Sequence, residues 1–151
     1  MTLHAGDPAP DFELETTSGR VRLSDLRGRR VVLAFYQEDA TPSCTAEVTA
    51  LRDERETLAE LGATVIAVSA DDLDSHQRFL QQLGDVPFPL ASDATLNVGR
   101  SYDVIDDTGK RTRRAVFVID EDGKIAHAIP WYNPSNAQQY EEIFRALGME
   151  F

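Results

Sequence analysis

The sequence predicts an α/β protein in which a mixed β-sheet lies between two layers of helices. Three observations lead to this prediction. Short apolar runs rich in β-branched residues, typical of buried strands, alternate with stretches whose apolar residues recur at helical spacing. Two strands joined by a tight turn and a final helix follow these units, so antiparallel strands join a parallel sheet. No linker or repeat divides the 151 residues, and we therefore expect one domain over residues 1–151.

The chain begins with a predicted β-hairpin and a buried strand. Apolar and polar residues alternate in residues 11–14 and 21–23, on either side of Thr17-Ser18-Gly19. Residues 31–36 form a short apolar run rich in strand-forming residues, and this run predicts a buried strand.

Two helices and another strand are predicted next. A helix from about Ser43 to Leu61 ends at Gly62, and residues 64–69 form a second buried strand. The apolar face of this helix carries Val48, Leu51, Leu58 and Leu61. The following helix can be capped by Asp71, Asp72 or Asp74, and its periodic residues are His76, Phe79, Leu80 and Leu83.

The C-terminal part predicts a short strand, a short helix, a hairpin and a last helix. The strand covers residues 88–91 and the short helix residues 96–102. Residues 115–119 and 125–129 flank an acidic turn that contains Gly123, which is typical of a hairpin. The last helix is entered through Asn133-Pro134-Ser135, ends at Gly148 and carries Tyr140, Ile143, Phe144 and Leu147.

The charge and hydropathy of the sequence limit the classes of partner and the compartment that we expect. The formal net charge of −11 argues against nucleic acid and anionic membranes as partners, because both require a basic surface. The sequence has no apolar run long enough to span a membrane and no signal peptide, so we expect a cytoplasmic protein. The basic residues that cluster are Arg27, Arg29 and Arg30, and then Lys110, Arg111, Arg113 and Arg114, which can be read as two solvated turns.

Cys44 is the candidate nucleophile. It is the one cysteine of the chain, which excludes an intramolecular disulfide and a cysteine-based zinc site. A lone cysteine is often only a small buried hydrophobe. Cys44, however, follows a predicted strand and loop at the start of a helix, where open α/β sheets form their sites. Unpaired N–H groups and the helix dipole favour a thiolate at this position.

The segment 35–47 resembles the active-site loop of peroxiredoxins, the AhpC/TSA superfamily, whose pattern is Pro-x-x-x-Thr-x-x-Cys. Thr41 and Cys44 match this pattern in type and spacing. The form Thr-Pro-x-Cys-Thr, with Glu47 three residues after the cysteine, is similar to the branch called PrxQ or bacterioferritin comigratory protein. Residues 6–12 and 114–120 also resemble family motifs, and the element order resembles a thioredoxin-like fold with an N-terminal β-hairpin extension.

The resemblance implies a thiol-dependent peroxidase that reduces hydrogen peroxide or organic hydroperoxides through a Cys44 sulfenic acid. It further implies that Thr41 aligns the peroxide, Arg114 stabilises the developing charge and Glu47 orients Arg114, while Pro42 shapes the loop. The residues alone leave other interpretations open. Thr41 can cap the helix, and Glu47 can be an exposed acid of the first turn. Arg114 can be a solvated charge, with Arg111 and Arg113 as rivals for its role.

Two departures from the family pattern affect the expected mechanism. Gln37 replaces the first proline, so the pocket shape and the peroxide rate are expected to differ, and Gln37 is included as a supporting residue. Thr49 stands where many relatives carry a resolving cysteine. The sulfenic acid therefore requires an external thiol, which can be thioredoxin, a glutaredoxin or a small thiol. Without such a thiol it can overoxidise to a sulfinic acid.

The remaining candidates give weaker signals. His4, His76 and His127 lack ligand spacing, so no metal is predicted, and no cofactor motif is present. We interpret His76 as a packing residue, and we expect Trp131 and Tyr132 to pack in the core rather than line a pocket or interface. The sequence leaves monomer and homodimer equally open.

Two other functions compete with peroxide reduction. A thioredoxin-type disulfide oxidoreductase would place its paired cysteines at Thr41 and Cys44, and the missing thiol argues against it. A thioredoxin-like redox sensor or binding protein with weak peroxidase activity is compatible with Gln37.

Overall fold

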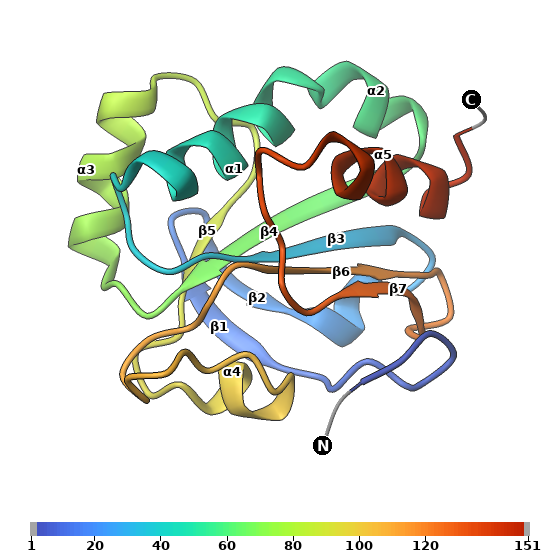
Figure 1. Cartoon of the computed structure of the whole chain (residues 1–151), viewed down its shortest axis with the longest axis horizontal. Coiled ribbons are helices and arrows are strands. Elements are labelled where there is room, and N and C mark those ends of the chain that lie inside the picture. The colour runs from blue at the N-terminus through green and yellow to red at the C-terminus, as the bar shows by residue number, and fades with distance from the viewer. Residues whose placement is uncertain (1–2, 150–151) are drawn as a thin grey trace.

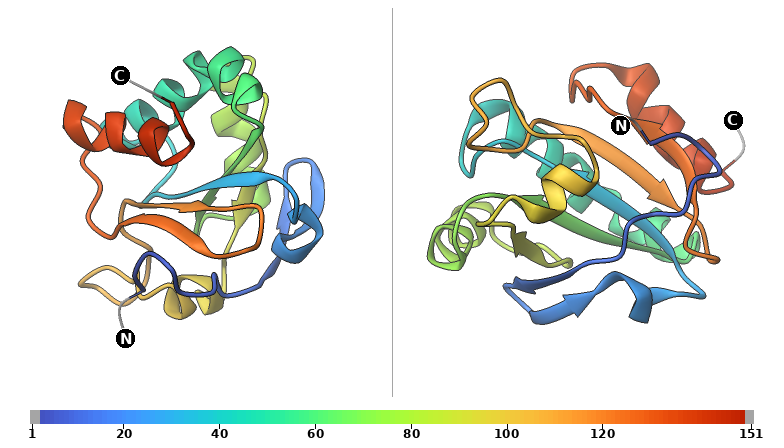
Figure 2. Two further views of the ribbon diagram at one scale, coloured as in Figure 1. Left: turned by 90° about the vertical axis from the view of Figure 1, so that its right-hand side faces the viewer. Right: turned by 90° about the horizontal axis from the view of Figure 1, so that it is seen from below.

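The computed structural model describes residues 3–149 and contains a seven-stranded mixed sheet in the order β2-β1-β5-β4-β3-β6-β7 (Figure 1). Four helices cover one face of the sheet, while the shorter α4 and the N-terminal segment lie across the other (Figure 2). This arrangement is the predicted α/β sandwich with a mixed sheet. The strands are β1 (Glu13–Thr16), β2 (Gly19–Arg22), β3 (Arg30–Phe35), β4 (Ala63–Ser69), β5 (Leu90–Ser92), β6 (Ala115–Ile119) and β7 (Ile125–Ile129). The helices are η1 (Leu23–Leu26), α1 (Pro42–Asp53), α2 (Arg55–Glu60), α3 (Leu73–Leu83), α4 (Asn97–Ser101) and α5 (Ala137–Ala146).

The inner strand β3 supplies side chains to both cores. Val32 and Ala34 face the core under the four helices, and Cys44 belongs to the same core. Leu33 and Phe35 face the core under α4. This alternation follows from the period of two in a strand, and burial on both faces explains why residues 31–36 are continuously apolar.

The register of β3 positions the site. β3 pairs with β4 in parallel and with β6 antiparallel, and Phe35 lies opposite Ala115. Arg114, the residue before β6, therefore lies beside Tyr36, the residue after β3. The N–H of Tyr132, beyond the end of β7, donates to the carbonyl of Arg114 at 2.9 Å. Three chain segments thus converge at the carboxyl end of β3.

The long helix predicted from Ser43 to Leu61 is wrong in one respect, because the structure divides it into α1 and α2. Glu54 leaves the helical region at φ −100° and ψ 23°, and its N–H bonds Leu51 O at 3.2 Å in a tighter turn. A new helical bond runs from the N–H of Leu58 to Glu54 O at 2.9 Å. The break keeps Leu58 buried in the same core as Leu51.

Most other predicted elements are present, with shifted ends. The first hairpin begins at Glu13 instead of residue 11, and η1 was not predicted. The strands at residues 115–119 and 125–129 have the predicted bounds. Within residues 3–149, the structure contains no helix with the length and apolar character needed to cross a bilayer.

Candidate active site

Cys44 lies in the first turn of α1, at the carboxyl end of β3. Its side chain is 1% exposed and packs among the apolar residues beneath the helices. Pro42 occupies the first helical turn, where its missing N–H costs no hydrogen bond. The sulfur accepts a hydrogen bond from the backbone N–H of Gln37 at 3.3 Å. Cys44 is therefore buried but contacts a polar donor from the preceding loop.

Thr41 is the N-cap residue of α1. Its backbone is extended, and its carbonyl accepts the N–H of Thr45 at 2.8 Å. Its side chain does not cap the helix, because the hydroxyl donates to the carbonyl of Glu38 at 2.9 Å. The hydrogen bond from the Thr41 hydroxyl thus stabilises the loop before α1. The hydroxyl oxygen retains lone pairs that can accept a hydrogen bond.

Glu47, which is buried, and Arg114, which is half-buried, interact electrostatically. Glu47 is 1% exposed, so it is not the solvated acid that the sequence left open. Both Glu47 carboxylate oxygens and Nε of Arg114 lack a hydrogen-bond partner among the described residues. Burial raises the pKa of Glu47 well above 4.5; the electrostatic interaction with Cys44 raises it further, and the guanidinium of Arg114 opposes both effects. Glu47 thus interacts electrostatically with both Cys44 and Arg114.

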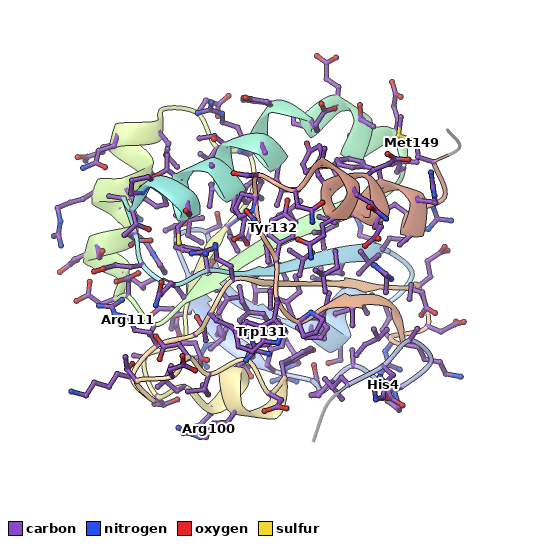
Figure 3. The ribbon with its side chains drawn as sticks, in the orientation of Figure 1. His4, Arg100, Arg111, Trp131, Tyr132 and Met149 are labelled. Carbon is purple, nitrogen blue, oxygen red and sulfur yellow. The ribbon has the colours of Figure 1, made fainter. Side chains whose placement is uncertain are left out.

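The two rivals of Arg114 each donate to acceptors of their own. Arg111 donates from one guanidinium nitrogen to Asp71 Oδ1 at 3.1 Å and to the carbonyl of Gln37 at 3.2 Å. Arg113 donates through Nε to the carbonyl of Pro130 at 2.6 Å. Both residues brace loops, and Figure 3 shows Arg111 on the loop that leads into β6.

A pocket of about 560 Å³ opens at Arg114. It is lined by Gln37, Asp106, Asp107, Thr108, Arg113, Arg114, Trp131, Tyr132 and Asn133. Core packing was predicted for Trp131 and is wrong, since the indole is 67% exposed and lies 4.0 Å from the Arg113 guanidinium carbon. Tyr132 packs in the core as predicted but also lines the pocket, and Figure 3 labels both residues, which lie on the segment after β7.

Sequence reasoning missed a buried network that fixes the loop before α1. Asp39 accepts hydrogen bonds from the hydroxyls of Tyr36 at 2.6 Å and Ser75 at 2.8 Å. Its Oδ2 also lies 2.8 Å from Nδ1 of His76, whose Nε2 contacts the carbonyl of Ala91 at 2.9 Å. His76 is therefore more than a packing residue. No spacing in the sequence links positions 39 and 76, so no local signal predicts this contact.

The fold and the placement of Cys44 define a thioredoxin-like protein with a one-cysteine redox site. The AhpC/TSA family model matches residues 5–128. The chain is 38% identical over 137 residues to a putative peroxiredoxin Bcp of Coxiella burnetii, covering 86% of this chain and 90% of the relative. It is 38% identical over 132 residues to peroxiredoxin Bcp of Bacillus subtilis, covering 83% of each.

The chain is also similar to solved structures of proteins with related names. Peroxidoxin BcpB of Mycobacterium tuberculosis superposes with a TM-score of 0.86 and 31% identity over 97% of both chains. The bacterioferritin comigratory protein of Xanthomonas campestris superposes with a TM-score of 0.81 and 26% identity, covering 98% of this chain and 96% of that one. The chain belongs to the AhpC/TSA family and is a peroxiredoxin, a peroxidase that takes its electrons from a thiol.

Proposed function

We propose that this peroxiredoxin reduces hydrogen peroxide or organic hydroperoxides in a cycle that uses Cys44 alone. The Cys44 thiolate attacks one peroxide oxygen, the O–O bond breaks, and the departing oxygen takes up a proton to give water or an alcohol. The resulting sulfenic acid reacts with one thiol to form a mixed disulfide and water. A second thiol releases Cys44 and leaves as a disulfide. The observation that carries this proposal is the placement of buried Cys44 in the first turn of α1, where its sulfur accepts a hydrogen bond from the backbone N–H of Gln37.

Arg114 is proposed to stabilise the charge that develops on the sulfur and the departing oxygen. Its Nε is buried without a hydrogen-bond partner among the described residues, and Arg114 also lines the pocket. A guanidinium without a bound acceptor can donate to a peroxide oxygen at no cost of breaking another bond. Glu47 is proposed to orient this guanidinium from the core side, because its buried carboxyl is the acidic group that interacts with it there.

Thr41 and Pro42 are proposed to shape the peroxide site. The Thr41 hydroxyl donates its hydrogen bond to the carbonyl of Glu38. Its oxygen can therefore accept a hydrogen bond from a peroxide and align the peroxide for attack. Pro42 starts α1 with a fixed φ, which holds Cys44 in the first helical turn.

An external thiol completes the cycle in this proposal, since no second cysteine exists in the chain. Thioredoxin, a glutaredoxin or a small thiol can serve, and a cytoplasmic location would keep such thiols reduced. The protein is proposed to act as a monomer or a homodimer, without a cofactor.

The test is stoichiometric oxidation followed by recycling. The reduced protein receives one equivalent of hydrogen peroxide, and mass spectrometry follows the gain of one oxygen, with Cys44→Ser as the control. We expect oxidation much faster than that of free cysteine, and turnover when a recycling thiol is added. Oxidation at the rate of free cysteine would overturn the proposal. Arg114→Lys, which keeps the charge but loses the fork of donors, should slow the oxidation step.

A further inference from the structure

The peptide bond between Tyr36 and Gln37 points its N–H at the reactive sulfur. The N–H of Gln37 donates to Sγ of Cys44 at 3.3 Å, and it is a backbone group, so it carries no charge and cannot titrate away. The N–H of Tyr36, one residue earlier, still belongs to the sheet and bonds Val68 O at 2.9 Å. The chain therefore leaves the sheet at Gln37 and turns its next donor toward the cysteine.

The same peptide plane is fixed at its other end. The carbonyl of Tyr36 accepts a hydrogen bond from the hydroxyl of Thr112 at 2.7 Å, and Thr112 is fully buried. In a trans peptide, the C=O and N–H groups of one plane point in opposite directions. A hydroxyl that holds the Tyr36 carbonyl thereby also sets the direction of the Gln37 N–H.

Gln37 is held at two further points. Its carbonyl accepts a hydrogen bond from Arg111 at 3.2 Å, and its side-chain Nε2 donates to Asp106 Oδ2 at 3.1 Å. Asp106 is itself fixed in a tight turn, where it accepts from the hydroxyl of Thr108 at 2.6 Å. A donor held in place before reaction stabilises developing charge without a cost of reorganisation.

We propose that the backbone N–H of Gln37 is a catalytic hydrogen-bond donor to Cys44, and that Thr112 is the positioning residue that aims it. The donor stabilises the thiolate before attack, because a hydrogen bond to the charged form favours that form. This inference rests on the proposed function for its effect on rate. It differs from the proposed roles of Thr41 and Arg114, because it assigns the donor to a position where a proline would have no N–H.

Two substitutions distinguish the effect of the Gln37 backbone N–H from the effect of the Gln37 side chain. Gln37→Pro removes the N–H, whereas Gln37→Ala keeps it and loses only the contact with Asp106. Loss of one aimed donor costs about 10²-fold when it serves an oxyanion, and sulfur is a weaker acceptor. We therefore expect Gln37→Pro to slow oxidation of Cys44 by peroxide by about tenfold and to move the pH midpoint of thiolate formation upward. Gln37→Ala should lose much less.

Thr112 provides a test that leaves Gln37 intact. Thr112→Val removes the hydroxyl at nearly constant shape, and we expect a smaller loss of rate with an upward shift of the same pH midpoint. Thr112→Ser keeps a hydroxyl and should restore the midpoint. A general packing defect would affect both variants alike and would not follow the hydroxyl. Circular dichroism establishes that each variant is folded.

An amide NMR titration decides the matter even if Gln37→Pro fails to fold. In the wild-type protein, the Gln37 amide proton should move as Cys44 ionises, and this movement should vanish in Cys44→Ser. An unmoved amide proton, or folded Gln37→Pro and Thr112→Val proteins with wild-type rate and midpoint, would overturn the proposal. A wild-type protein that oxidises no faster than free cysteine would instead refute the proposed function, while the titration would still report the hydrogen bond.

Discussion

Nδ1 of His76 lies 2.8 Å from Oδ2 of Asp39, and this contact joins α3 to the loop that leads to Thr41 and α1. His76 has no exposed surface, and its other ring nitrogen meets the carbonyl of Ala91. Burial alone would lower the pKa of His76, but the hydrogen bond and the charge of Asp39 raise it above 6.5. Burial likewise opposes ionisation of Asp39, and its hydrogen bonds with His76, Tyr36 and Ser75 bring its pKa below 3.8.

The first prediction is that His76→Asn destabilises the protein by about 3 kcal/mol at pH 6, because removing one partner leaves a buried charge unpaired. The contribution of His76, whose pKa is raised, is complete below pH 6.5 and is lost as the pH rises through the folded value. The contribution of Asp39 is present above its unfolded value of 3.8 and is lost at lower pH. Urea unfolding from pH 5 to 9 measures the difference, which should shrink at the alkaline end. A gap that widens with pH would contradict this assignment.

The second prediction concerns Glu47, whose carboxyl is buried without hydrogen-bond partners among residues 3–149. Because its pKa is raised well above 4.5, the unfolded chain ionises first and the folded state loses stability as the pH rises above that value. Glu47→Gln removes this loss, so the variant should gain about 1 kcal/mol or more over the wild type at pH 8, and less at pH 4. Its peroxide rate should nevertheless fall severalfold, since Arg114 loses its acidic neighbour. Thermal unfolding and oxidation kinetics on the same samples measure both effects.

The third prediction follows from the burial of Cys44, whose side chain is 1% exposed. A bulky alkylating reagent such as N-ethylmaleimide requires local opening of the loop or of α1, so its reaction with the folded protein should be slow. Unfolding in urea should accelerate alkylation by at least tenfold at constant pH. Hydrogen peroxide is small and should react fastest with the folded protein. Equal alkylation rates in both states would mean that the sulfur is open to solvent.

The fourth prediction uses Trp131, the one tryptophan of the chain. Its indole is exposed and stacks on Arg113 at the wall of the pocket. We expect an emission maximum close to that of free tryptophan, quenched efficiently by acrylamide. Trp131→Leu should cost only about 0.5–1 kcal/mol, the value of an exposed cation–π contact. A blue-shifted, unquenched emission would show that the indole is buried in solution.

The sequence predicts most of the fold because its signals are local. Short apolar runs indicate strands of a sheet that is buried on both faces. The bounds of β6 and β7 follow from the turn between them. The break at Glu54 could not be foreseen, because apolar spacing continues across it and no glycine or proline marks it. The prediction for Trp131 was wrong because a large aromatic after a strand usually enters the core, whereas this indole stacks on Arg113 at the surface.

The sequence predicts which residues are candidates for the site, but not the contacts that hold them in place. The motif spacing identified Cys44, Thr41 and Arg114 as candidates, and strand parity alone could not separate Arg114 from Arg111 and Arg113. The separation depends on tertiary contacts, since Asp71 and Pro130 engage the two rivals from distant segments. The roles of Asp39, His76 and Thr112 likewise arise from contacts between residues more than 30 positions apart.

The pairing of Phe35 with Ala115 makes the site depend on chain length as well as on side-chain chemistry. Because side chains alternate across a strand, one residue added to the start of β6 would either exchange the two cores that this strand serves or, if β6 kept its register, displace Arg114 from Tyr36. Single substitutions along β6 disturb packing alone, whereas an insertion there would change the position of Arg114 or of the β6 side chains relative to β3. In a directed-evolution library of this enzyme, length variation in β6 should therefore abolish activity even in clones that still fold.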